Sequence, residues 1–164
     1  MAIPESIQSF LNRNGATYSE MRHPVAYTAQ QEAALAHVPG LEWAKTVVCL
    51  IDGEPIQAVL PASYNINEAQ LRALTGARSL RFAEESEFEP LYPGCERGAM
   101  PPFGPMYGQR VFVDRALVDD PEIVFNAGTH ADAIRMRYED FASLVQPVVG
   151  QFAQRAAGRG SGLW

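Results

Sequence analysis

Residues 42–51 form a largely apolar segment that contains the longest uninterrupted apolar run of the chain, Val47 to Ile51, and is followed by a turn signal. Its apolar residues occupy both alternating sets of positions, which is typical of a strand buried on both faces. Asp52-Gly53 comes next, and Asp-Gly between two apolar runs predicts a tight hairpin. We therefore expect residues 56–60 to form the partner strand.

The rest of the chain alternates between helix-like and strand-like spacing of its apolar positions. The expected helices cover residues 3–14, 28–37, 67–74, 85–91 and 138–146, the last extending past Pro147 to about residue 156. The expected strands cover residues 16–22, 109–113, 122–126 and 133–137, with a short one near residue 80. This order predicts one α+β domain around a mixed β-sheet with flanking helices, spanning residues 1–156, and a disordered tail at 157–164.

Composition narrows the classes of protein to consider. The chain has 164 residues, 47% of them hydrophobic, and a formal net charge of −6. The negative charge weighs against a general nucleic-acid-binding protein but allows contact with one end of a nucleic acid through a local patch. No targeting or membrane-spanning segment is visible, and the two cysteines form no disulfide framework, so we expect a cytoplasmic protein without membrane contact.

Lys45 is the single lysine among thirteen basic residues, the other twelve being arginines. In a β-strand it shares a face with Trp43 and Val47, so its amine lies among apolar side chains. Such an amine must be paired, extend to solvent or line a pocket, because isolated burial of a charge is costly. A site that needs a compact primary amine is one interpretation, and a lysine extending to solvent from a strand end is the other.

Two further segments are candidates for chemistry. Residues 93–108 contain four glycines and four prolines, which predicts a rigid loop whose amides near Gly98 could face a carbonyl or an anion. Residues 125–130 end a strand in glycine, hydroxyl and imidazole groups, as expected at the edge of a cleft. Each segment could also be purely structural, and so could His130. We interpret His23 and His37 as structural, with His23 near the site. No spacing of ligands predicts a metal site, and no motif predicts a cofactor.

Taken together, three motifs resemble the YbaK/EbsC family of aminoacyl-tRNA deacylases, which are related to the editing domain inserted in bacterial prolyl-tRNA synthetase. They are Ala-Lys-Thr-Val-Val around Lys45, Gly-Ala-Met-Pro-Pro-Phe from Gly98, and Phe-Asn-Ala-Gly ending at Gly128. The resemblance runs from about residue 23 to residue 146. It implies a curved mixed sheet and a freestanding trans-editing hydrolase that removes a small non-cognate amino acid from tRNA without a metal or cofactor.

The resemblance also implies a set of site residues. Lys45, Gly98 and Pro102 match the functionally required lysine and the ends of the family's G-x-x-x-P loop. The implied substrate-binding residues are Tyr27, Thr46, Ala99, Met100, Pro101, Asn126, Gly128, Thr129 and His130. The expected partner is the acceptor end of an aminoacyl-tRNA, with an aminoacyl-tRNA synthetase as a further candidate partner.

Two other functions remain open from the sequence. The chain could be a binding module that holds aminoacyl-tRNA or a synthetase without hydrolysis. It could also be an enzyme that forms a Schiff base between Lys45 and a carbonyl substrate, which would need a desolvated amine of low pKa.

Overall fold

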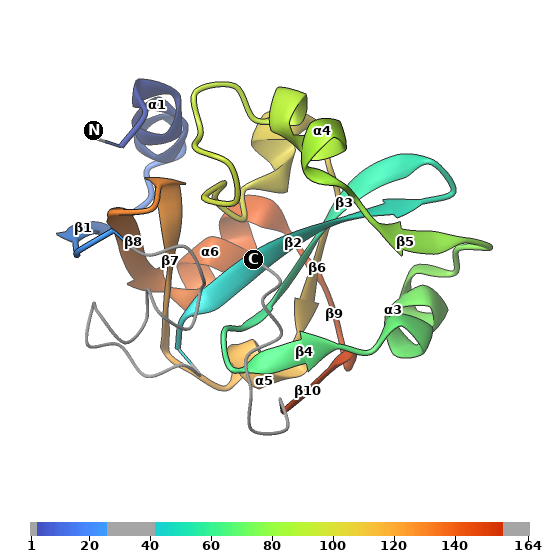
Figure 1. Cartoon of the computed structure of the whole chain (residues 1–164). Coiled ribbons are helices and arrows are strands. Elements are labelled where there is room, and N and C mark those ends of the chain that lie inside the picture. The colour runs from blue at the N-terminus through green and yellow to red at the C-terminus, as the bar shows by residue number, and fades with distance from the viewer. Residues whose placement is uncertain (1–2, 26–41, 156–164) are drawn as a thin grey trace.

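The computed structural model describes residues 3–25 and 42–155. It is an α+β fold, as the sequence predicts, and its largest sheet is mixed. The α1 helix and strands β1, β7 and β8 lie at one side of the molecule, and α3 and β5 lie at the other, with β2 running between them (Figure 1). No helix in the described ranges is long and apolar enough to cross a membrane.

The five-stranded sheet has the order β5-β2-β3-β6-β9. Strands β2 (Ala44–Ile51) and β3 (Glu54–Pro61) form the expected antiparallel hairpin. Its turn residues, Asp52 and Gly53, both have positive φ, as this tight turn requires. β5 (Leu80–Phe82) pairs antiparallel with β2, whereas β6 (Val111–Asp114) and β9 (Val148–Gly150) add in parallel beyond β3.

A three-stranded antiparallel sheet has the order β1-β8-β7. Its strands are β1 (Ser19–Arg22), β7 (Glu122–Thr129) and β8 (Asp132–Arg137). An isolated parallel bridge between Trp43 and Val124 joins this sheet to the start of β2. The short strands β4 (Tyr64–Ile66) and β10 (Ala153–Arg155) form a separate antiparallel pair.

Helix ends follow local sequence signals. α1 (Glu5–Arg13) buries Ile7, Phe10 and Leu11, which form one apolar stripe. α3 (Glu68–Thr75) begins after Asn67, whose side chain accepts a hydrogen bond from the backbone, and ends at Gly76 in the left-handed conformation. The remaining helical segments are α4 (Glu85–Phe88), η1 (Glu89–Leu91), η2 (Gly104–Tyr107), α5 (Arg115–Val118) and α6 (Tyr138–Val145).

The core that positions the site is aromatic. The ring of Phe103, from the glycine- and proline-rich loop, is fully buried and lies 5.5 Å from Phe10 and 5.1 Å from Phe125, measured between ring centroids. Phe141 of α6 packs on the same group. The loop is therefore anchored by a buried ring that contacts α1 and β7.

The predicted helix at 138–146 is confirmed, but its extension past Pro147 is wrong, and three short strands were not predicted. α6 ends at Val145 instead of continuing past Pro147. Pro147 cannot donate a helical hydrogen bond and restricts the residue before it, and Gln146 takes a positive φ of 48°. Residues 148–150 and 153–155 instead form β9 and β10, and β4 is the partner of β10. The predicted helix at 28–37 and the predicted tail at 157–164 lie outside the described residues.

Candidate functional site

Lys45 lies inside the protein, near the start of β2. The residue is 6% exposed, and desolvation lowers the pKa of its amine from the ordinary 10.5 to about 8. No hydrogen bond or ion pair joins this amine to another residue of the described chain. This burial favours an amine that lines an enclosed site over one that extends into bulk solvent.

The neighbouring strand places Asn126 level with Lys45. Trp43 and Val124 form a parallel bridge, and the amide of Val124 donates to the carbonyl of Glu42 at 3.0 Å. Lys45 and Asn126 each lie two residues beyond this bridge. Because side chains alternate between faces along a strand, both lie on the face occupied by Trp43 and Val124.

Three buried polar atoms around Trp43 have no hydrogen-bond partner in the described part of the chain. They are His23 Nε2, Trp43 Nε1 and Asn126 Oδ1. The rings of His23 and Trp43 meet edge to face, with centroids 5.6 Å apart. Each buried polar group left without a partner costs about 1–3 kcal/mol, so groups of this kind mark a place where water or a ligand belongs. Together with the Lys45 amine, this surface offers both donors and acceptors to a bound molecule.

The glycine- and proline-rich loop is fastened to the end of β7 by backbone hydrogen bonds. The amide of Glu96 donates to the carbonyl of Gly128 at 2.7 Å, and the amide of Gly128 donates to the carbonyl of Ala99 at 2.8 Å. Gly128 has a φ of +94°, and a Cβ added there would lie 2.6 Å from Cδ of Pro4. Glycine is thus required at this position by both conformation and space.

The loop amides differ in their availability. The amide of Ala99 donates to the carbonyl of Glu96 at 3.0 Å, so it cannot also bind a substrate carbonyl. The amides of Gly98 and Met100 have no such acceptor among the described residues. The sequence suggested that the amides from Gly98 to Met100 could bind a carbonyl or an anion. Of these, only the amides of Gly98 and Met100 remain available.

Thr129 and His130 are occupied in holding the turn between β7 and β8. The Thr129 hydroxyl donates to Asp132 Oδ2 at 2.6 Å. The His130 amide donates to Glu96 Oε1 at 2.9 Å, and its Nε2 lies 2.6 Å from the carbonyl oxygen of Arg97, where it must be the donor. The contacts of His130 join the glycine- and proline-rich loop to the β7–β8 hairpin, and the contact of Thr129 holds the turn of that hairpin, so both residues have a structural role.

A buried glutamine that the sequence analysis did not select holds the proline end of the loop. Gln57 on β3 is fully buried, and its Nε2 donates to the carbonyl of Pro101 at 3.1 Å and to the hydroxyl of Tyr92 at 3.3 Å. The Tyr92 hydroxyl in turn donates to Gln109 Oε1. The signal in the sequence was a single polar residue within the apolar strand at 56–60.

Not all predicted site residues share one face. Met100 packs with Val48 and Tyr92, whereas Val47 belongs to a different hydrophobic cluster with Leu60. Since Lys45 has the parity of Val47, the sheet separates its side chain from that of Met100. Thr46 has the parity of Val48 and points to the Met100 side. Pro101 and Pro102 are buried in the loop, and Tyr27 lies outside the described residues.

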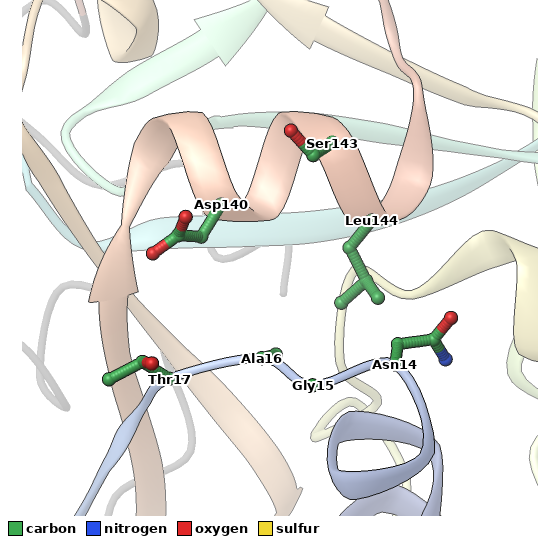
Figure 2. A pocket seen from close by; sticks show the side chains of 7 residues that line it. All are labelled: Asn14, Gly15, Ala16, Thr17, Asp140, Ser143 and Leu144. Atoms are coloured by element: carbon green, nitrogen blue, oxygen red, sulfur yellow. The ribbon is translucent and has the colours of Figure 1, made fainter.

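Two pockets lined wholly by described residues do not have Lys45 in their lining. Figure 2 shows one, between α6 and the turn after α1. It is lined by Asn14, Gly15, Ala16, Thr17, Asp140, Ser143 and Leu144. The other is lined by Ile3, Gln8, Glu20, Met21, Arg22 and Asp132. Within the described ranges, no group of three or more His, Cys, Asp or Glu side chains is arranged to hold a metal ion.

Comparison with known proteins assigns the fold and the motifs to a family. A profile described as the aminoacyl-tRNA editing domain matches residues 23–144, most of the chain. The chain belongs to this family. The matched region contains Lys45, the loop from Gly98 to Pro102 and the end of β7.

Relatives occur both within synthetases and as separate proteins. A proline–tRNA ligase of Nitratidesulfovibrio vulgaris strain Hildenborough is 33% identical over 105 residues, which cover 64% of this chain and 18% of the ligase. The chain thus corresponds to a small part of that ligase. The multifunctional Ser/Thr-tRNA deacylase ProXp-y of Escherichia coli K12 is 25% identical over 153 residues, covering 90% of this chain and 91% of the relative.

Solved structures share the fold. The crystal structure of hypothetical protein APE2540 superimposes with a TM-score of 0.81 at 21% identity, covering 91% of this chain and 99% of that one. A protein described as a candidate trans-editing enzyme for prolyl-tRNA synthetase gives a TM-score of 0.78 at 20% identity, covering 92% and 96%. At these identities the likeness establishes the fold.

Proposed function

We propose that this protein is a freestanding trans-editing hydrolase that cleaves the ester between a small non-cognate amino acid and the terminal adenosine of tRNA. Membership of the editing-domain family supports this reaction class. The E. coli relative, a Ser/Thr-tRNA deacylase by name, matches along nearly its whole length, which supports a separate enzyme. We also propose that it acts in the cytoplasm, because tRNA is charged there.

One observation carries the proposal: the mostly buried Lys45 shares a strand face with Trp43 and Asn126, and among the described residues neither its amine nor the buried polar atoms of Trp43, Asn126 and the adjoining His23 have a hydrogen-bond partner. Stability alone gives no reason to retain such a group, because an apolar side chain of the same size would avoid the desolvation cost. A bound substrate would supply the missing partners. With its pKa near 8, the Lys45 amine is still mostly protonated at neutral pH and can attract an anion or a carbonyl oxygen.

The reaction needs little from the protein beyond positioning and charge. Water attacks the ester carbonyl carbon, the carbonyl oxygen becomes an oxyanion, and the bond to the ribose oxygen then breaks. The proton lost by the water ends on that ribose oxygen. We assign Lys45 to the phosphate or ester region of the substrate, and the amides of Gly98 and Met100 to the developing oxyanion. Pro102 and Gly128 hold the loop that presents those amides.

Selectivity for a small amino acid would follow from a confined site. Side chains larger than the editing pocket are rejected sterically, whereas selection of a hydroxyl-bearing side chain over an apolar one of the same size requires a placed polar group. Asn126 and the other polar atoms near Trp43 are suited to that second task. Because the chain has a net charge of −6, we expect weak, salt-dependent affinity for tRNA on its own, and a synthetase partner would compensate.

The test is multiple-turnover hydrolysis of tRNAs mischarged with alanine, serine, threonine or cysteine, with the tRNA in large excess over protein. We expect repeated turnover on at least one of the four and none on a correctly charged control with a large side chain. Stoichiometric binding without turnover would instead indicate a binding module. Irreversible labelling of Lys45 by borohydride in the presence of an aldehyde or ketone substrate would indicate Schiff-base chemistry.

A further inference from the structure

His23 is fixed next to the candidate site by its backbone and by one ring nitrogen. It follows β1 directly, and its amide donates to the carbonyl of Ala131 at 3.0 Å. Its side chain is buried, with 8% of the residue exposed, and packs edge to face on Trp43. Trp43 lies two residues before Lys45 on the same face of β2.

The contacts of His23 determine which ring nitrogen can accept a hydrogen bond. Its Nδ1 lies 2.8 Å from the carbonyl oxygen of Pro24. A carbonyl oxygen only accepts, so Nδ1 carries the hydrogen. In the neutral ring, Nε2 then holds the lone pair. This Nε2 is buried and has no donor among the described residues.

We propose that His23 Nε2 accepts a hydrogen bond from a hydroxyl group in the occupied editing site. This inference rests on the function proposed above. Two hydroxyls of an aminoacyl-tRNA hydrolysis complex have suitable chemistry: the attacking water and the 2′-hydroxyl of the terminal ribose. In either case the bond orients the hydroxyl oxygen toward the ester, so it should matter more in the transition state than in substrate binding.

The test compares substitutions that separate packing from hydrogen bonding. His23→Phe keeps a ring against Trp43 but has no acceptor, whereas His23→Gln places an amide oxygen close to the position of Nε2. On the best mischarged substrate, we expect His23→Phe to lower kcat about 10- to 100-fold with KM changed less than about 3-fold. We expect His23→Gln to stay within about 5-fold of the original kcat, with both variants unfolding at the same urea concentration as the original protein.

A substrate whose terminal adenosine lacks the 2′-hydroxyl identifies the partner. If the partner is water, His23→Phe loses the same factor on this substrate. If the partner is the 2′-hydroxyl, the loss disappears because the original protein has already lost that bond.

Two results would overturn the inference while leaving the proposed function intact. One is a folded His23→Phe variant with kcat within 2-fold of the original. The other is an equal loss in His23→Phe and His23→Gln, which would mean that the ring matters only for packing. If His23→Phe does not fold, His23→Asn takes its place, since its amide can still reach the Pro24 carbonyl but offers nothing at the Nε2 position. Absence of hydrolysis by the original protein on every substrate would instead refute the proposed function.

Discussion

Replacing Lys45 with methionine tests whether the buried amine is kept for function at a cost in stability. Methionine has a similar length and no charge, so Lys45→Met removes the desolvation cost and preserves most of the packing. The fall in the pKa of the amine from 10.5 to about 8 corresponds, at about 1.4 kcal/mol per pKa unit, to a cost of about 3.5 kcal/mol. Relaxation around the amine makes this an upper value. We therefore expect Lys45→Met to raise the free energy of unfolding at pH 7 by about 1–3 kcal/mol.

The same reasoning gives the dependence on pH. Between about pH 8 and pH 10.5 the unfolded chain keeps the Lys45 proton and the folded chain loses it. Because the unfolded state then binds more protons, the stability of the original protein rises with pH across this window. The cost is fully present below about pH 8 and is relieved as the pH approaches 10.5. The advantage of Lys45→Met should accordingly shrink over this range.

Urea unfolding followed by circular dichroism at pH 7 and pH 9.5 measures both effects. Arg72→Met is the matched control, because Arg72 is exposed on α3 and its replacement also removes one positive charge. We expect that control to change stability by less than about 0.5 kcal/mol. A Lys45→Met variant less stable than the original at pH 7 by more than about 1 kcal/mol would refute the reasoning, since it would show that the amine stabilises the fold.

Three further substitutions test how the loop and the C-terminal strands are held. Gly128→Ala should destabilise the protein by about 2–4 kcal/mol in urea unfolding, because the new Cβ meets Pro4. Gly76→Ala, at a position that also has positive φ but open space around it, should cost only about 1 kcal/mol, and equal losses in the two variants would contradict this. Gln57→Leu removes the hydrogen bond to the Pro101 carbonyl, so it should lower the free energy of unfolding by about 1–2 kcal/mol and the deacylation rate at least 5-fold. An unchanged deacylation rate would show that the loop does not depend on this hydrogen bond. Asp114→Asn should lower the free energy of unfolding, measured by thermal unfolding, by about 2–3 kcal/mol, because Oδ1 of this buried carboxylate accepts hydrogen bonds from two backbone amides. A loss of stability smaller than that of a surface variant would refute this role.

Local signals in the sequence predicted most of the elements. The Asp52-Gly53 turn, the cap at Asn67 and the stop at Gly76 each act within a few residues, so the sequence is sufficient to place them. The wrong prediction of helix after Pro147 arises from contacts that are distant in the sequence. Residues 148–150 and 153–155 become strands because β6 and β4 offer unpaired edges, and those edges come from remote parts of the chain.

The candidate site was also predicted only in part, because several of its contacts join residues that are distant in the sequence. Motifs selected Lys45, the Gly98 loop and Asn126, but no spacing in the sequence shows that Trp43 bridges to Val124 and places Lys45 level with Asn126. The role of Gln57 in holding Pro101 depends on contact between residues 44 positions apart. His130 looked available for chemistry until its contacts with Glu96 and Arg97 were known.

The most direct test of the account is single-turnover deacylation by Lys45→Met on the best mischarged tRNA, compared with the original protein and with Arg72→Met. We predict a loss of at least about 100-fold for Lys45→Met in a protein that is no less stable, and no loss for the control. Deacylation by a folded Lys45→Met variant at the original rate would contradict the claim that the Lys45 amine is the centre of this site.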